Sequence, residues 1–154
     1  MTLSGLFTWT YHGQDALALR DYQDDEQAFT AVKQFFMAID GTSVILLLIS
    51  LVVPIAVCCF YHWGFNKKPG RHYRPVFQLL FFLIAAFATI SLSWILEIVL
   101  ISLPPVDNNF GVFLFDVSLG AMCVGMLVYV VTALTIGMTG RTNAYPLHKI
   151  FSKR

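Results

Sequence analysis

Two acidic side chains, Glu97 and Asp116, lie inside long apolar stretches of this sequence. Glu97 lies as many residues before the centre of the turn PPVDNN as Asp116 lies after it. In an antiparallel helical hairpin the two carboxylates are therefore predicted to lie level with each other. Level carboxylates can share a proton or bind a cation. Pairing with a base has little support, because no Lys or Arg lies in either stretch.

The depth of the two acids in a membrane has two interpretations. If the apolar stretches enter the membrane at the turn, both acids lie roughly 9 Å below the outer surface, where a lone charge is costly. If instead the ~20 residues that cross the hydrocarbon are counted from the cytoplasmic ends of these stretches, both acids lie at the outer interface. A carboxylate at that depth costs little, so its presence does not imply a function. Ser93 and Ser118 could add oxygen ligands, and Asp40 and Asp107 add negative charge on the same side. The candidates for ion binding or for lining a pore are therefore Glu97, Asp116, Ser93 and Asp40.

Small and hydroxylated residues accompany both acids at helical spacing. Successive i+4 positions lead from Ala85 to Glu97, and Asp116 shares a helix face with Gly120. Residues of this kind are typical of close helix contacts in membranes, so we expect both acids to face a helix interface rather than lipid. The residues predicted to pack in such an interface are Ala85, Thr89, Gly120, Ala121 and Gly125.

Other reactive residues form no recognisable site. Cys58 and His62 are spaced to share a helix face, but two ligands do not make a metal centre and no second histidine falls in an apolar stretch. The sequence also lacks the motifs of serine hydrolases, zinc proteases, phosphate-binding loops and dithiol enzymes. We therefore expect no enzymatic activity, no metal, no cofactor and no nucleic-acid partner.

Composition indicates which solvent surrounds the chain. Of its 154 residues, 57% are hydrophobic and only 12% are charged, with a mean hydropathy of +0.69. Soluble domains carry roughly 25% charged residues, and disordered chains are poor in apolar residues. The composition therefore favours a small integral membrane protein and argues against both a water-soluble globule and a disordered chain.

Three apolar runs could each cross the bilayer, at residues 42–63, 76–103 and 110–138. Each reaches the ~20 residues that a helix needs to span the hydrocarbon, and none shows the alternation of a membrane β-barrel strand. The sequence predicts an all-α, three-span transmembrane helical bundle, with residues 42–138 as its transmembrane domain.

The basic residues predict the orientation of this bundle. Eight of the ten lie in residues 64–75 and 139–154, whereas residues 1–42 carry a net charge of −4. By the positive-inside rule, the N-terminus is predicted to lie outside and the basic tail 139–154 in the cytoplasm. The loop can also contact anionic lipid head groups or a partner. Its basic residues are Lys67, Lys68, Arg71 and Arg74.

The extracytoplasmic segment 1–41 is predicted to contain an amphipathic helix over residues 24–39. Acidic residues suit the start of that helix, and apolar residues follow at helical spacing. One interpretation lays the helix along the outer membrane surface, leading into the first span through residues 40–43. The alternative is that Phe29, Phe35 and Phe36 dock against a partner subunit.

Two functional hypotheses follow from these patterns. The first is a non-catalytic, multi-pass membrane protein that acts as an oligomerising or accessory subunit of a membrane complex. The second is a small homo-oligomeric cation channel whose outer vestibule is acidic. Both predict the lipid bilayer as surroundings, with further copies of the chain or other membrane subunits as partners.

Overall fold

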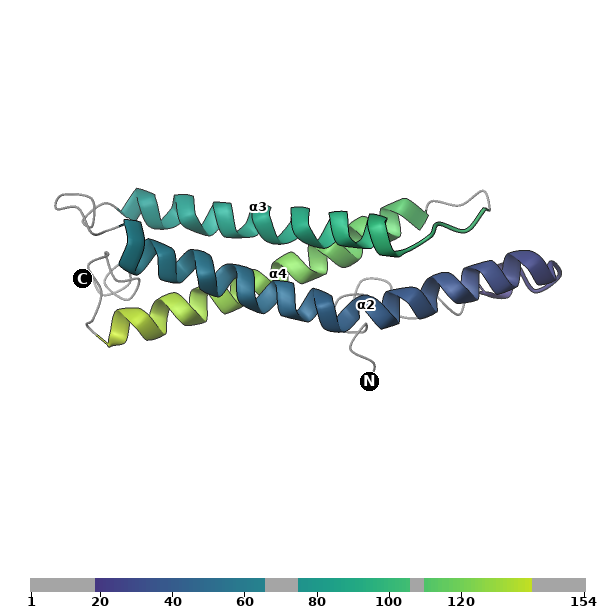
Figure 1. Cartoon of the computed structure of the whole chain (residues 1–154), viewed down its shortest axis with the longest axis horizontal. Helices are drawn as coiled ribbons and strands as arrows, with labels where there is room; N and C mark the ends of the chain where they lie inside the picture. Colours follow the sequence, from purple (N-terminus) through teal and green to yellow (C-terminus); the bar gives the residue numbers. More distant parts are fainter. Residues whose placement is uncertain (1–18, 66–74, 106–109, 140–154) are drawn as a thin grey trace. The chain divides into compact units, whose positions relative to one another are not determined.

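The computed structural model describes residues 19–65, 75–105 and 110–139, and its long elements are all helical. They are α2 (Glu26–Cys59), the π-helical turn η3 (Phe60–Gly64), α3 (Pro75–Leu100) and α4 (Phe110–Met138), as drawn in Figure 1. Three stretches are long and apolar enough to cross a membrane. They are Glu26–Gly64, Pro75–Leu100 and Phe110–Met138, so the prediction of an all-helical chain with three candidate spans is confirmed.

The two later helices follow the predicted spans closely. α4 begins at Phe110 and ends at Met138, as predicted. α3 begins one residue early and stops at Leu100 rather than at residue 103, with one last helical bond from the Ile101 N–H to the Glu97 carbonyl. Pro104 disfavours helical geometry at Leu103, the residue before it, so α3 is not expected to continue to residue 103.

α2 extends well before the predicted first span. Asp25 caps its start, since the Asp25 carboxylate accepts bonds from the N–H groups of Gln27 and Ala28 at 3.0 and 3.1 Å. The helix then continues through residues 40–43 without interruption. The Thr42 and Ser43 hydroxyls donate hydrogen bonds back to the Ile39 and Asp40 carbonyls at 3.0 and 2.6 Å. The residues predicted as a separate helix are therefore the first part of α2.

Some predicted segments lie outside the described residues. These are most of the N-terminal segment before residue 19, the basic loop with Lys67, Lys68, Arg71 and Arg74, the turn at 106–109 and the tail beyond residue 139.

The chain divides into two compact units. The first combines the described residues up to Leu48 with those between Ile90 and Ala121; the second combines Ile49–Thr89 with the described residues from Met122 onwards. Each helix contributes to both units. In the first, Val32, Phe35 and Leu114 are buried. In the second, the buried cluster consists of Cys58, Tyr61, Phe81, Ala85, Tyr129, Ala133 and Ile136.

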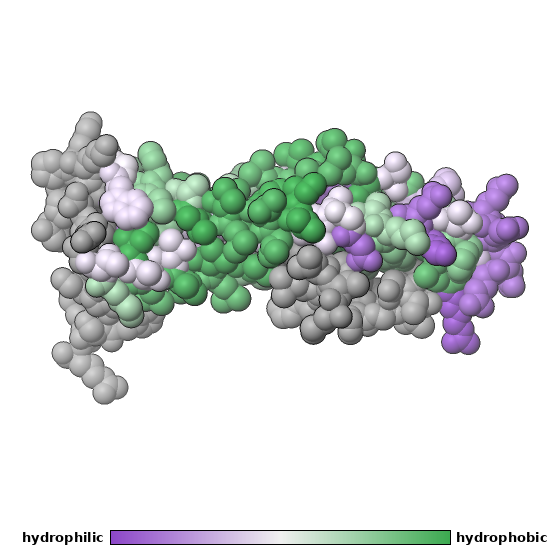
Figure 2. Space-filling view, turned by 60° about the horizontal axis from the view of Figure 1, so that its bottom comes forward, coloured by the Kyte–Doolittle hydropathy of each residue, from purple (hydrophilic) through white to green (hydrophobic). Residues whose placement is uncertain are grey.

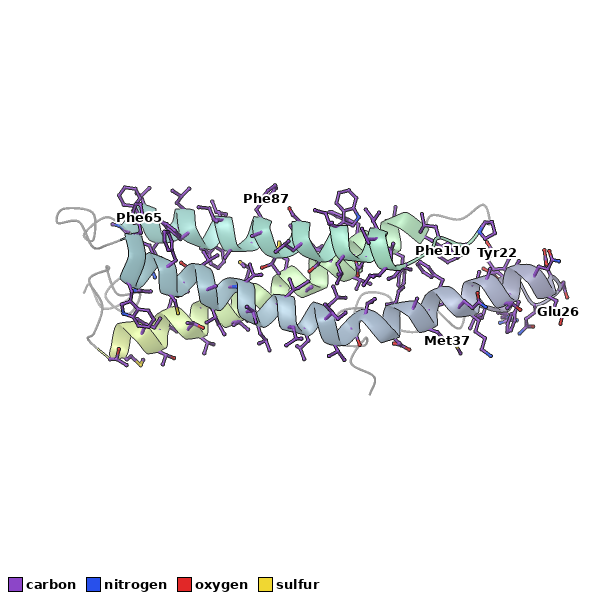
Figure 3. All side chains as sticks on the ribbon, in the orientation of Figure 1. Tyr22, Glu26, Met37, Phe65, Phe87 and Phe110 are labelled. Carbon is purple, nitrogen blue, oxygen red and sulfur yellow. The ribbon has the colours of Figure 1, made fainter. Side chains whose placement is uncertain are left out.

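Large apolar side chains cover the outside of all three helices. On the face shown in Figure 2, hydrophobic residues cover most of the described surface, and hydrophilic residues gather at the start of α2. Figure 3 shows Met37 pointing away from α2 and Phe87 away from α3, and these side chains are 59% and 73% exposed. In water such a surface would aggregate, whereas in a bilayer it is the expected lipid-facing surface.

Candidate functional site

The candidate site centres on Glu97, in the last turn of α3. Its side chain is completely buried, and the Ser118 hydroxyl of α4 donates a 2.5 Å hydrogen bond to its Oε2 atom. Both residues belong to the first unit. Glu97 therefore faces a helix interface, as expected, and this buried side-chain bond links α3 to α4.

Asp116 does not share this position. Its side chain is half-buried, and it precedes Ser118 by two residues in α4. Two residues correspond to about 3 Å of rise and about 200° of rotation in an α-helix. Asp116 thus lies close to the level of Glu97, as predicted, but on the opposite side of α4 from Ser118.

The other two predicted ion-binding residues differ in their surroundings. Ser93 precedes Glu97 by one helical turn, and its side chain is completely buried. Asp40 is exposed on α2. The structure thus brings Glu97 and Ser93 onto one buried face of α3, together with Ser118 of α4, and leaves Asp40 on the surface.

The small residues expected at helix contacts are buried within the chain. Gly125 of α4 shows the closest approach. A Cβ atom added there would lie 3.1 Å from Pro54 Cγ, 3.3 Å from the Ser50 carbonyl oxygen and 3.3 Å from Thr89 Cγ2. All four residues belong to the second unit. The other four small or hydroxylated positions are also buried: Ala85, Thr89, Gly120 and Ala121.

Aromatic side chains on the first part of α2 contact the beginning of α4. Phe35 is 2% exposed and meets Phe110 and Phe113 edge-on, with ring centroids 5.0 and 6.1 Å apart. Phe36 meets Phe113 at 5.5 Å. Figure 3 marks Phe110 at the first turn of α4. The beginning of α4 therefore covers part of the apolar face of residues 24–39. The sequence had suggested that a membrane surface or a partner subunit covers this face.

Cys58 and His62 are both buried, but α2 becomes the π-helical turn η3 between them. This turn also buries Tyr61, which is adjacent to His62. The sequence pattern gave no sign of a π-helix here. Within the described ranges, no group of three or more His, Cys, Asp or Glu side chains could hold a metal ion.

An apolar groove lies on the surface of the first unit, at the end of α3 and the start of α4. Trp94 and Phe115 form part of its wall and meet edge-on at a centroid distance of 5.8 Å. The remaining lining residues are Ile98, Ile101, Leu103, Gly111, Val112 and Leu114. Because its lining is almost entirely hydrocarbon, the groove suits apolar groups only.

The sequence matches no family model, and no curated protein or solved structure matches it either.

Proposed function

We propose that this protein is a non-catalytic, multi-pass subunit of a membrane complex, either a homo-oligomer or an assembly with other membrane proteins. The supporting observation is how the chain distributes its side chains. Small and hydroxylated residues are buried inside it together with aromatic side chains, whereas many other large apolar residues are exposed on its outer faces. Lipids and the apolar spans of other membrane proteins are the surroundings that such faces fit.

We further propose that the N-terminus lies outside and the basic tail in the cytoplasm, following the charge distribution of the sequence. The first part of α2 then lies on the outer side. At 34 residues, α2 is about 51 Å long, well above the ~30 Å of the hydrocarbon core. Its acidic beginning would stand at or beyond the outer membrane surface, where it is available to partners.

The cation-pore alternative has less support. A pore lined by Glu97 requires that carboxylate to face a lumen, but it is completely buried against Ser118. The half-buried Asp116 and the exposed Asp40 would remain to line an entry.

The mass of the purified protein tests the subunit proposal. The full chain, extracted from its native membrane in mild detergent, should run in native mass spectrometry as an assembly of fixed stoichiometry heavier than the 17.3 kDa chain. A monomer at every protein concentration would contradict the proposal.

Cysteine cross-linking then separates a homo-oligomer from a mixed complex. In a chain whose native cysteines are replaced by alanine, Phe87→Cys places a thiol on the outer face of α3, and Ala85→Cys places one on its buried face. If copies of the chain pack through this face, oxidation should produce dimers of Phe87→Cys but not of Ala85→Cys. Equal cross-linking of the two variants would argue against a specific interface between copies.

Ion flux tests the pore alternative directly. Liposomes containing the wild-type protein should leak cations no faster than protein-free liposomes. A flux that falls in Glu97→Gln or Asp116→Asn would favour a pore over the subunit role.

A further inference from the structure

Two polar atoms on the buried face of α3 lack hydrogen-bond partners. Glu97 accepts the Ser118 hydroxyl through Oε2, but within the described part of the chain its Oε1 has no partner. The Ser93 Oγ has none either. Both side chains are completely buried, and the two residues are one helical turn apart. Buried polar atoms are nearly always hydrogen-bonded, so these two require an explanation.

An ionised Glu97 would be a buried charge that accepts one hydrogen bond, from Ser118 to Oε2, and none at Oε1. A carboxylate can only accept hydrogen bonds, and a single hydroxyl donor compensates poorly for removing a charge from water. The charged residues of the surrounding elements supply no compensation: Lys33 and Asp40 of α2 are exposed, and Asp116 of α4 is itself acidic. No lysine or arginine occurs in α3 or α4.

We propose that Glu97 is a proton-binding site, holding a proton from bulk water on Oε1 and donating it towards Ser93 Oγ. Side chains on a helix lean towards the preceding turn, and residues four apart are neighbours at about 5–6 Å between Cβ atoms. The structure does not form this bond, but the two residues are neighbours on one face of α3, so a side-chain rotation can bring Oε1 and the Ser93 Oγ together. The hydrogen bonds would then run from Ser118 to Glu97 and from Glu97 to Ser93, and they would link α4 to α3 without a net charge.

A proton fits this site better than a metal cation does. Calcium takes six to eight oxygen ligands and magnesium six in a strict geometry, whereas the site offers one carboxylate and two hydroxyls. One of those hydroxyls, Ser118, already donates its hydrogen to Glu97. A proton shared with Asp116 is also disfavoured, because Asp116 lies on the opposite side of α4 from Ser118.

Isotope labelling tests the proposal in the unmodified chain, because Glu26 and Glu97 are its only glutamates. Cell-free synthesis with glutamate carrying ¹³C in the side-chain carboxyl gives two signals in lipid vesicles. Glu26 is exposed, so its signal provides the reference for an ionised carboxylate. The signal that disappears in Glu26→Gln is that of Glu26, and this assigns the other signal to Glu97. At pH 7 the remaining signal should be that of a protonated acid. A carboxylate signal from Glu97 at pH 7 would overturn the proposal.

Serine substitutions identify the acceptor of the proton. In Ser93→Ala, the infrared C=O band of the protonated Glu97 should shift to higher frequency, because its hydroxyl loses an acceptor. Ser91→Ala, half-buried on another face of α3, is the matched control and should leave the band unchanged. An unshifted band in Ser93→Ala would rule out Ser93 as the acceptor.

Exchange of the salt distinguishes a proton from a cation. Replacing choline by sodium, or adding calcium, at constant pH should leave the Glu97 signal unchanged. Conversion to a carboxylate signal on adding either cation would show metal binding and overturn the proposal.

Discussion

Gly125 lies where α4 approaches Pro54, Ser50 and Thr89 most closely. All three distances from an added Cβ atom lie between 3.1 and 3.3 Å, tighter than ordinary van der Waals contact. The Ser50 carbonyl is backbone within α2 and the Pro54 ring is rigid, so neither can move away easily. The glycine is therefore required by packing, and not merely tolerated in the helix.

Enlarging this residue should destabilise the fold. Gly125→Leu is expected to lower the free energy of unfolding by about 1–3 kcal/mol, the usual cost of overpacking, measured by SDS titration of the micellar protein. Gly111→Leu is the control, since nothing lies within 4 Å of a Cβ at Gly111, and its effect should stay within about 0.5 kcal/mol. Equal losses in the two variants would show that the close approach does not matter.

The site could be predicted only partly from single residues. Glu97 is recognisable because it is an acid in an apolar run. The symmetry of the hairpin also indicated which part of α4 lies at the same height as Glu97. The partner is nevertheless Ser118, not Asp116. The height of a residue along a helix depends on the residue count alone, whereas the side of the helix on which its side chain lies depends on the rotation of the helix about its axis. Two residues apart, Asp116 and Ser118 lie on nearly opposite sides of α4. The symmetry of the hairpin does not determine which of them faces Glu97.

At the scale of elements, the start of α2 depends on one side chain. Asp25→Ala removes the acceptor for the N–H groups of Gln27 and Ala28, at a cost of about 1 kcal/mol. We expect these two amides to exchange with deuterium about five-fold faster, as measured by NMR, because about 1.4 kcal/mol corresponds to ten-fold. Asp24→Ala is the control, and comparable acceleration there would contradict the cap.

The contact between α2 and α4 in the first unit can be measured by a double-mutant cycle. Phe35→Leu and Phe110→Leu together should show a coupling energy of about 0.5–1.5 kcal/mol, as edge-on aromatic pairs do. Met37→Leu with Phe110→Leu should be additive within about 0.5 kcal/mol, because Met37 points outwards. A coupling near zero for the aromatic pair would mean that the two rings do not pack in the membrane.

The helix boundaries were predictable where the chain chemistry changes abruptly. Turn residues precede α4 and polar residues follow it, so both of its ends agree with the prediction. The continuity of α2 was not predicted, because Asp40, Gly41, Thr42 and Ser43 resemble a loop in sequence. Within a continuous helix the two hydroxyls bond to their own backbone instead. The π-helical turn η3 has no sequence pattern that would have revealed it.

For the whole molecule, orientation is the property most open to test. In a chain whose native cysteines are replaced by alanine, Thr2→Cys should react with a membrane-impermeant maleimide added outside. Ser152→Cys should react only after permeabilisation. Replacing Lys67, Lys68, Arg71 and Arg74 by glutamate should reduce the outside labelling of Thr2→Cys, because it removes the positive charge that retains the loop inside. Labelling of Thr2→Cys only from the cytoplasm would reverse the proposed orientation.

The position of Glu97 along α3 means that membrane thickness would affect how much water surrounds its side chain. Glu97 lies 22 residues after Pro75, and Met138 lies 22 residues after Asp116, which is about 33 Å in each helix. Plasma membranes have hydrocarbon cores of about 32–33 Å, and the endoplasmic reticulum about 27 Å. If Pro75 and Met138 mark the inner edge of the hydrocarbon, the Glu97–Ser118 bond would lie at its outer edge in the thicker bilayer and among hydrated head groups in the thinner one. The hydrogen bond between Glu97 and Ser118 would thus meet a drier environment when a protein of this kind moves from the endoplasmic reticulum to the plasma membrane.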